Sequence, residues 1–301
     1  MSASILKWAS KDGSFKRQPS QFRNWISKSG PHQPEPDRYL LYVSLACPWA
    51  HRTLIARHLK GLAGCIDVAV VHYLMEEGGW RFDETITGCT KDPVYGINYL
   101  SELYFKQDPQ YSGRFTVPVL FDKKLERIVS NESADIVRML NSEFNDFADN
   151  PSLDLYPEGM AEEIDRLNEW MYERFNNGVY RAGFATAQEK YEEAAVQVRD
   201  ALYELDEILK RRTFLAGDQL TEADIRAFTT AIRHDPVYFG HFKCNLIAVK
   251  DLENVLKWLK RVYKLVKPTI NMDHIKRHYY LSHKQINPTG IVPLGNGPLL
   301  E

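Results

Sequence analysis

The pattern of apolar and polar residues divides the chain into two parts with different periodicity. Between residues 39 and 145, short apolar runs typical of strands alternate with helical stretches, and the first run is Tyr39–Val43. A helical segment follows it, glycines at 61 and 64 end that segment, and a second strand is predicted at 66–73. A strand, a helix and a strand in this order predict a parallel pair.

From about residue 150 the pattern changes to long helical periods. Apolar residues recur at spacings of three and four in four segments, 161–176, 189–211, 221–233 and 252–263. Thr221 and Asp224 have the spacing of a capping box, with Asp in place of Glu or Gln. We therefore expect an α/β domain over 39–145 and an all-helical domain over 150–270.

The two ends and one internal segment lack this regularity. Residues 1–38 are polar and rich in proline, and we expect an extended arm that its apolar side chains anchor to the body. Those side chains are Phe15, Phe22, Trp25 and Ile26. Residues 75–113 are rich in glycine, aromatic and charged residues without a clean period, which predicts a long functional loop inserted in the α/β domain. Residues 271–301 are predicted to be a C-terminal extension.

Composition and charge narrow the classes of function. The chain has 301 residues, of which 38 are basic and 40 acidic, so nothing indicates a general attraction to nucleic acid or to a membrane surface. No apolar run approaches the length of a membrane span, and the first residues do not resemble a signal peptide. Four cysteines without a C-x-x-C pair fit neither a disulfide framework nor a zinc site. We therefore expect a cytoplasmic protein.

Cys47 is the residue with the clearest chemical signal. It follows the first strand and precedes Pro48, which suits the first position of a helix. Backbone N–H groups and the helix dipole favour a thiolate at such a position, so Cys47 is a candidate nucleophile. The alternative interpretation is that Cys47 is a small apolar side chain buried in the core. Because a lone cysteine has no internal partner, an external thiol such as glutathione must resolve any mixed disulfide that it forms.

Two further pairs of residues draw attention beside Cys47. Pro118 interrupts a strand-like run directly after Val117, and this pair is a candidate for contact with a bound peptide. The alternative is an ordinary proline on an edge strand. Glu132 and Ser133 lie at a predicted helix start, which can hold the charged γ-glutamyl end of glutathione. The alternative for this pair is an ordinary N-cap with an acid in the first turn.

Several stretches resemble known families. Residues 47–50 resemble the active-site corner of thioredoxin-fold proteins, with the second cysteine of C-x-x-C replaced. Val117 and Pro118 resemble the pair in such folds that has a cis peptide bond and offers backbone groups to a bound peptide. Over residues 40–293 the chain resembles the glutathionyl-hydroquinone reductases, also called xi-class or omega-like glutathione transferases. The stretches that carry this resemblance are 46–52, 78–82, 114–119, 131–136, 177–185, 235–239 and 275–293. It implies a glutathione transferase fold, with a thioredoxin-like α/β N-terminal domain, an all-α C-terminal domain and a homodimeric assembly.

The resemblance also implies roles for individual residues. Cys47 would be the nucleophile and Tyr180 a second catalytic residue. The glutathione contacts would be Trp80, Arg114, Phe115, Thr116, Val117, Pro118, Glu132 and Ser133. Tyr238 and Tyr280 would surround the aromatic substrate, although Tyr279 is adjacent and spacing does not choose between the two. The alternative for these tyrosines is that they line the helical core.

The implied reaction is cleavage of a glutathionyl-hydroquinone to hydroquinone through a mixed disulfide of Cys47 with glutathione, which releases oxidised glutathione. Glutathione is the co-substrate, and no metal, flavin or nicotinamide is needed. A thiol transferase, dehydroascorbate reductase or protein deglutathionylase would use the same cysteine and stays open. Conjugation of glutathione is disfavoured because a cysteine stands where a serine or tyrosine hydroxyl would be needed. A non-catalytic binding module is a further alternative.

Overall fold

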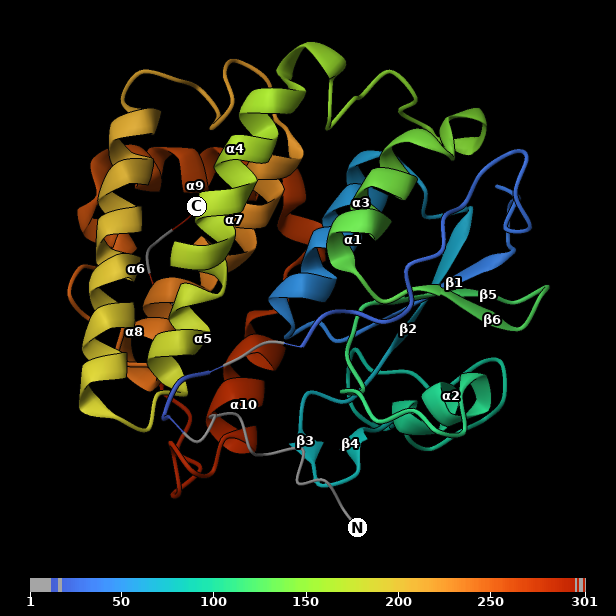
Figure 1. Cartoon of the computed structure of the whole chain (residues 1–301), viewed down its shortest axis with the longest axis horizontal. Helices are drawn as coiled ribbons and strands as arrows, with labels where there is room; N and C mark the ends of the chain where they lie inside the picture. Colours follow the sequence, from blue (N-terminus) through green and yellow to red (C-terminus); the bar gives the residue numbers. More distant parts are fainter. Residues whose placement is uncertain (1–11, 16–17, 296, 298–299, 301) are drawn as a thin grey trace. The chain divides into compact units, whose positions relative to one another are not determined.

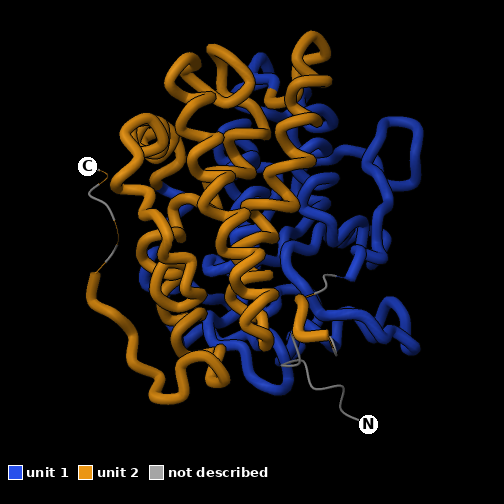
Figure 2. The backbone as a smooth tube through the Cα atoms, turned by 60° about the vertical axis from the view of Figure 1, so that its left-hand side comes forward, with its two compact units in different colours: residues 1–5, 18–154, 268–274 blue, residues 6–17, 155–267, 275–301 orange. Residues whose placement is uncertain are grey.

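The chain divides into two compact units (Figure 2). The computed structural model describes residues 12–15, 18–295, 297 and 300. The first unit consists of Gln18–Asp154 and Pro268–His274, and the second of Leu155–Lys267 with residues 12–15 and the chain from Ile275 onward. Residues 1–11, 16 and 17 of the predicted arm lie outside the described residues.

A four-stranded sheet organises the first unit (Figure 1). Its strands are β1 (Tyr39–Val43), β2 (Ile66–Val70), β5 (Val119–Asp122) and β6 (Arg127–Ser130), in the order β2-β1-β5-β6. Helix α1 (Pro48–Leu59) joins the parallel strands β1 and β2, which confirms the predicted strand–helix–strand unit. The pairs β1–β5 and β5–β6 are antiparallel. Strand β2 ends at Val70, before the predicted end at residue 73, and the N–H of His72 donates to the carbonyl of Arg81.

Both faces of the sheet are covered, since β1 is buried along its whole length. On one face Tyr39 packs edge-on against Phe144, which follows helix α3 (Ser133–Ser142). Helices α1 and α3 contact each other. On the opposite face, reached by the alternation of side chains along a strand, Tyr42 packs against Phe82 and donates to Asp92 at 2.7 Å. The segment 75–113 therefore covers this second face.

That segment is more regular than the sequence predicts. It contains a hairpin of β3 (Met75–Glu76) and β4 (Gly79–Trp80), and then helix α2 (Leu100–Gln107). Glu102 stabilises the start of α2, because its Oε1 accepts a hydrogen bond from the N–H of Tyr99 at 2.9 Å. A helix of eight residues is too short to produce a clear apolar period, so the pattern alone predicts a loop there.

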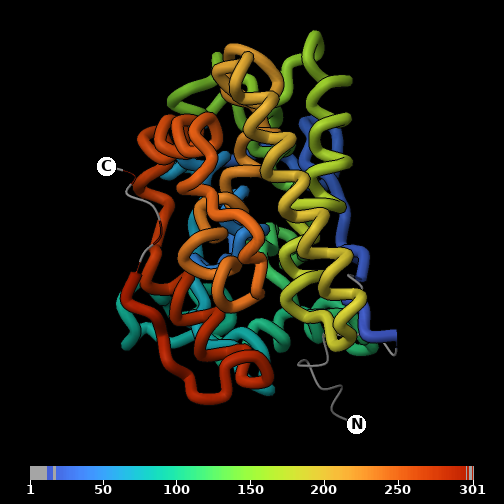
Figure 3. The backbone as a smooth tube through the Cα atoms, turned by 90° about the vertical axis from the view of Figure 1, so that its left-hand side faces the viewer, coloured from blue at the N-terminus to red at the C-terminus, as the bar shows by residue number. Residues whose placement is uncertain are grey.

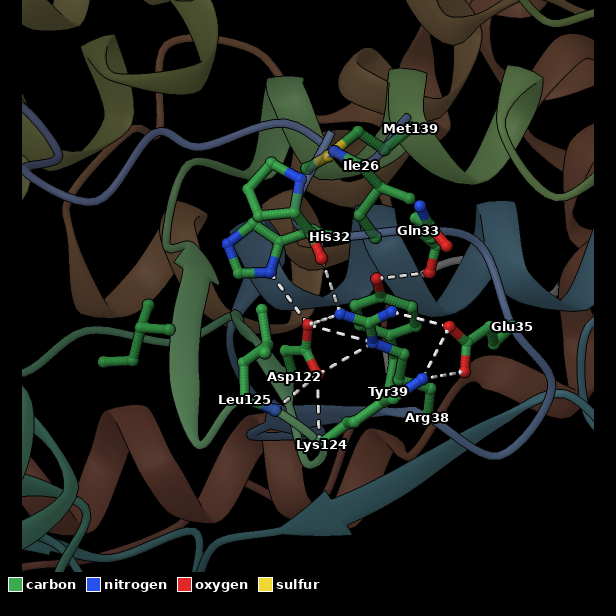
Figure 4. A network of polar contacts seen from close by, with 12 residues as sticks. Ile26, His32, Gln33, Glu35, Arg38, Tyr39, Asp122, Lys124, Leu125 and Met139 are labelled. Carbon is green, nitrogen blue, oxygen red and sulfur yellow. Dashed lines mark hydrogen bonds and ion pairs between the residues drawn. The ribbon is translucent and has the colours of Figure 1, made fainter. Parts of the chain in front are cut away.

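A buried polar network attaches residues 32–38 of the arm to β5 (Figure 4). Arg38 donates to Asp122 at 2.6 Å through Nη2, and His32 Nδ1 lies 2.8 Å from the same carboxylate. Burial raises the pKa of Asp122, but hydrogen bonds from Arg38 and His32 outweigh burial and lower it overall. Ile26 is fully buried as expected, whereas Trp25 is 42% exposed and so anchors the arm less than the sequence suggests.

The second unit is helical, as predicted. Its helices are α4 (Ala161–Met171), α5 (Gly178–Gly183), α6 (Gln188–Leu209), α7 (Glu222–Arg233), α8 (Phe239–His241), α9 (Glu253–Val266) and α10 (Met272–Ser282), the last of which begins in the first unit. Helix α6 contacts α5 and α9, and α7 contacts α4 and α9 (Figure 3). Within the described part of the chain, no helix is both long and apolar enough to cross a lipid bilayer.

Shorter helical turns connect these elements. Two are π-helical, η3 (Tyr172–Asn176) and η4 (His234–Tyr238). The others are 3-10 turns, namely η1 (Asn145–Phe147), η2 (Glu158–Met160), η5 (Val249–Asp251) and η6 (Lys267–Thr269).

The predicted capping box is present at the start of α7 and reaches further than its own helix. Asp224 is fully buried, and its carboxylate accepts a hydrogen bond from the N–H of Thr221, as the box requires. The same carboxylate oxygen also accepts from the Thr221 hydroxyl. Asp224 also accepts from the N–H of Leu215 and from Trp258 Nε1, both at 2.9 Å. One carboxylate therefore ties the preceding loop and α9 to the first turn of α7.

We expect Asp224→Ala to lower the free energy of unfolding by about 3 kcal/mol or more, because several buried donors lose their acceptor at once. Urea unfolding followed by circular dichroism measures the change. The matched control is Asp218→Ala in the same loop, where the exposed carboxylate accepts only a long hydrogen bond from Thr213. Similar midpoints for the two variants would contradict this role of Asp224.

Candidate active site

Cys47 lies where the sequence places it, at the N-cap of α1. Its backbone is extended, with φ −73° and ψ 123°, and Pro48 occupies the first helical position. The N–H of Cys47 donates to the carbonyl of Ser44, which closes the turn after β1. The side chain is half-buried. The thiol therefore stands at the end of a helix that stabilises negative charge.

The segment before β5 is a neighbour of this thiol. The Sγ of Cys47 lies 3.5 Å from the carbonyl oxygen of Val117, to which the thiol donates. The Val117–Pro118 peptide bond is cis, as the resemblance to thioredoxin-like folds implies. The two stretches that the sequence singles out separately are thus in direct contact.

The basic residues after Cys47 contact other groups in the same unit. Arg52 is buried, and its guanidinium carbon lies 4.4 Å from the centre of the Trp49 ring. His51 is also buried, and its Nε2 lies 2.9 Å from the hydroxyl of Thr269. Arg52 is therefore held against Trp49 and does not point to solvent.

The other three cysteines have environments that suppress reactivity. Burial raises the pKa of Cys65 and of Cys244, and both side chains are almost fully buried. Burial also raises the pKa of Cys89 to about 11. These three thiols are therefore protonated at neutral pH, which leaves Cys47 as the candidate nucleophile. Among the described residues, no group of three or more His, Cys, Asp or Glu side chains is placed to hold a metal ion.

Glu132 and Ser133 begin α3, with Glu132 as its N-cap. One oxygen of the Glu132 carboxylate accepts from the N–H of Ala134 at 3.1 Å, so the N-cap interpretation is correct as far as it goes. The other oxygen accepts from the hydroxyl of Ser20 at 2.9 Å. Ser20 belongs to the arm, and local sequence patterns give no sign of this long-range contact.

Aromatic residues from α2 and the turn after it hold the segment 114–117. Tyr104 donates to the carbonyl of Thr116 at 2.7 Å, and Tyr111 donates to the carbonyl of Arg114 at 2.9 Å. The ring of Phe115 packs against both tyrosines. Trp80, another predicted glutathione contact, ends β4 and is buried. Tyr104 and Tyr111 lie in the segment without a clean period and are missed by the sequence analysis.

Three tyrosines of the second unit form a chain of hydroxyl groups. The hydroxyl of Tyr279 lies 2.6 Å from that of Tyr180 and 2.9 Å from that of Tyr238. Tyr238 and Tyr279 are fully buried, whereas Tyr180 is half-buried. Tyr280 points elsewhere, and its hydroxyl donates to the carbonyl of Pro236 at 3.4 Å. Of the two adjacent tyrosines, Tyr279 therefore belongs to the chain.

Burial controls the protonation of this chain. It raises the pKa of Tyr238 and of Tyr279 well above the value of a free tyrosine. Both hydroxyls therefore stay protonated far above neutral pH. Each can donate a hydrogen bond within the chain of hydroxyls that ends at Tyr180.

Two π-helical turns accompany the chain of hydroxyls. The turn η4 ends at Tyr238 and contains Pro236, whose missing N–H interrupts the regular helical ladder. The turn η3 ends just before α5, which carries Tyr180, and the amide of Asn176 in η3 donates to the hydroxyl of Thr230 on α7. Turns of this kind are frequent at functional sites, where they reorient side chains.

A pair of buried histidines lies beside these tyrosines, and the sequence analysis does not single it out. His241 Nε2 lies 3.1 Å from His283 Nδ1, and the ring of His283 packs against Tyr279. Burial lowers the pKa of His241 to about 3 and that of His283 well below its usual value. The pair is therefore neutral at physiological pH and shares one proton between the facing nitrogens.

The chain is similar to known glutathione transferases. The chain matches the families described as glutathione S-transferase, N-terminal domain, over residues 46–143, and glutathione S-transferase, C-terminal domain, over residues 188–261. The glutathionyl-hydroquinone reductase YqjG of Escherichia coli is 51% identical over 296 residues, which cover 95% of this chain and 90% of YqjG.

Solved structures agree with this match. The glutathione-S-transferase Xi of Phanerochaete chrysosporium is 48% identical, with a TM-score of 0.93 over 95% of this chain and 94% of that one. The glutathione-bound structure of YqjG is 51% identical, with a TM-score of 0.88 over 93% of each chain. The chain therefore belongs to the glutathione transferase superfamily and, within it, to the xi class.

Proposed function

We propose that this chain is a glutathione-dependent reductase that cleaves glutathionyl-hydroquinones to hydroquinones. The observation that carries the proposal is the position of Cys47, a half-buried thiol at the start of α1 in contact with the cis Val117–Pro118 segment. It is supported by a relative of 51% identity that is named glutathionyl-hydroquinone reductase.

The reaction takes two steps that balance without a further cofactor. The thiolate of Cys47 attacks the sulfur of the glutathionyl thioether, an S–S bond forms, and the C–S bond to the ring breaks. The ring carbon keeps the electron pair of that bond and takes up a proton, which gives the hydroquinone. A second glutathione, as thiolate, then attacks the mixed disulfide, which releases oxidised glutathione and restores the thiolate of Cys47.

The ring carbon is a poor leaving group unless a proton reaches it, and we assign this role to the tyrosines. Tyr180 is the half-buried end of the chain of hydroxyls, so we propose that it contacts the substrate. Tyr279 and Tyr238 stay protonated because burial raises the pKa of both, and they supply the hydrogen bonds behind Tyr180. Tyr280 then serves packing rather than proton transfer.

Glutathione itself is proposed to bind in the first unit, in the domain expected over residues 39–145. Backbone groups of residues 114–117 before the cis proline would pair with its peptide part, and Trp80 would line the site. Glu132 and Ser133 at the start of α3 would hold the γ-glutamyl end, where a carboxylate, a hydroxyl and helix N–H groups lie together. The helical domain expected over residues 150–270 would then bind the aromatic part.

Reduction of small mixed disulfides is a second activity of the same thiol. The contact of Cys47 with Val117 and its helix-start position suffice for disulfide exchange, in which a thiol leaves and no ring needs a proton. Thiol transfer, dehydroascorbate reduction and protein deglutathionylation all belong to this class. We further propose that the protein acts as a homodimer in the reducing cytosol.

The decisive experiment supplies a glutathionyl-hydroquinone and an excess of glutathione and measures both products by chromatography. We expect free hydroquinone and oxidised glutathione to appear in equal amounts, because each cycle releases one of each. The control omits the second glutathione, and then at most one hydroquinone should be released per protein chain. If the protein instead joins glutathione to quinones and never releases hydroquinone, the proposed function is wrong.

A further inference from the structure

Residues 20–24 of the arm, called the arm segment below, run antiparallel to the end of β6. The N–H of Asn24 donates to the carbonyl of Val129 at 2.8 Å, and the N–H of Asn131 donates to the carbonyl of Phe22 at 3.0 Å. Arg23 adds a two-pronged ion pair with Asp135, with both distances at 2.7 Å. The arm segment is therefore fixed in register against the strand and the helix start that carry Glu132.

This register brings Ser20 to the Glu132 carboxylate. The Ser20 hydroxyl lies 2.9 Å from Oε2 of Glu132 and 3.3 Å from the carbonyl oxygen of Asn131. Oε1 of Glu132 meanwhile accepts from the N–H of Ala134. Each carboxylate oxygen of Glu132 therefore has a different donor, Ala134 for Oε1 and Ser20 for Oε2. The Ser20 hydroxyl thus fixes the orientation of the oxygen that the helix start does not hold.

A second set of contacts locks the arm segment to the loop before the cis proline. The N–H of Phe22 donates to Asn131 Oδ1, and Asn131 Nδ2 donates to the hydroxyl of Tyr104. Tyr104 in turn donates to the carbonyl of Thr116. The ring of Phe22 also packs on those of Tyr104 and Tyr111, with 5.8 Å between centres in both cases. Asn131 is thus hydrogen-bonded both to the arm and to the residue that holds Thr116.

A hollow of about 370 Å³ opens beside Ser20, lined by Gln18, Pro19, Ser20, Gln21, Ser112 and Gly113. The side chains that line the hollow are uncharged. Ser20, one of them, donates to the carboxylate of Glu132 and so connects this wall to a negative charge. An uncharged polar wall next to an anchored carboxylate suits the amino-acid end of a peptide, whose ammonium group pairs with the carboxylate.

We propose that the arm is a working part of the glutathione site, with Ser20 as a positioning residue that orients Glu132 toward the ammonium group of the γ-glutamyl end. This inference rests on the proposed function only in so far as glutathione binds at Glu132. It gives the arm a role in substrate affinity, in addition to its packing against the first unit.

The test compares glutathione affinity by calorimetry, and the KM for glutathione, in variants of Ser20. We expect Ser20→Ala to weaken glutathione binding about fivefold to tenfold, because one hydrogen bond to a charged group is lost. The KM should rise more than kcat falls. Ser20→Thr keeps the hydroxyl and should restore most of the affinity. Trp25→Phe is the matched control in the arm, because the Trp25 indole donates to Glu143 at the C-cap of α3, and this variant should bind glutathione as the parent does.

A double-mutant cycle with Glu132→Ala tests whether Ser20 acts through the carboxylate. In that background Ser20→Ala should have no further effect on affinity, because there is no carboxylate left to orient. Equal glutathione affinity in the parent and Ser20→Ala, or a fully additive loss in the double variant, would overturn the inference. A parent protein that does not bind glutathione at all would instead contradict the proposed function.

Discussion

Replacement of Cys47 by serine is expected to stop the release of hydroquinone from glutathionyl-hydroquinones, with a loss of at least about 10³-fold in kcat. Serine has nearly the same size and keeps the N-cap position of α1, so the fold should persist. Its hydroxyl cannot form the mixed disulfide on which both steps of the cycle depend. Steady-state release of hydroquinone, with folding checked by circular dichroism, measures the effect.

Mass spectrometry of the same proteins after incubation with oxidised glutathione identifies which thiol is modified. The parent should gain one glutathione, and Cys47→Ser should gain none. Cys89→Ser is the matched control, because Cys89 is also half-buried but burial raises its pKa to about 11. This control should react as the parent does. Release of hydroquinone by Cys47→Ser at the rate of the parent would rule out Cys47 as the nucleophile.

Replacement of Tyr279 by phenylalanine is expected to slow cleavage of the thioether by about 10²-fold, the size typical of a lost proton-transfer group. The Tyr279 hydroxyl bonds to both Tyr180 and Tyr238, so its removal takes away both of these hydrogen bonds. Reduction of a small glutathione mixed disulfide should be nearly unchanged, since its thiol leaves without a proton on carbon. Rates of the two reactions, measured on the same protein sample, give the comparison.

The adjacent residue supplies the control for this prediction. Tyr280→Phe removes a hydroxyl that lies outside the chain and donates a long hydrogen bond to the carbonyl of Pro236, so we expect little change in either rate. If Tyr279→Phe slows both reactions to the same extent, the tyrosine shapes the pocket and does not assist protonation. Equal effects of the two variants on thioether cleavage would also contradict the proposed chain of hydroxyls.

Local signals explain what the sequence predicts well. Cys47 at a helix start follows from a strand, a turn and Pro48 within a few residues, and the structure has these elements in these places. The capping box of Thr221 and Asp224 is likewise a short pattern with one geometric meaning. Each of these features depends on neighbours within one helical turn, so it is visible without knowledge of the rest of the fold.

Features that depend on distant residues are the ones that the sequence does not show. The choice between Tyr279 and Tyr280 is decided by contacts with Tyr180 and Tyr238, which are far away along the chain. The contact of Ser20 with Glu132 joins residues separated by 112 positions. Helix α2 was too short to show a period. In each case tertiary packing supplies the information.

The arm segment also covers part of the outer edge of the sheet. β6 is an outer strand of the sheet, and an unpaired outer strand offers backbone N–H and C=O groups to any extended chain that approaches. Here the backbone of Phe22 and Asn24 already occupies positions on that strand, and the charged side chain of Arg23 is directed to Asp135. A neighbouring molecule therefore finds the end of β6 at Val129 already paired. The same segment that we assign to substrate affinity also protects this part of the edge against edge-to-edge aggregation, and a dimer that continued the sheet there would have to displace the arm.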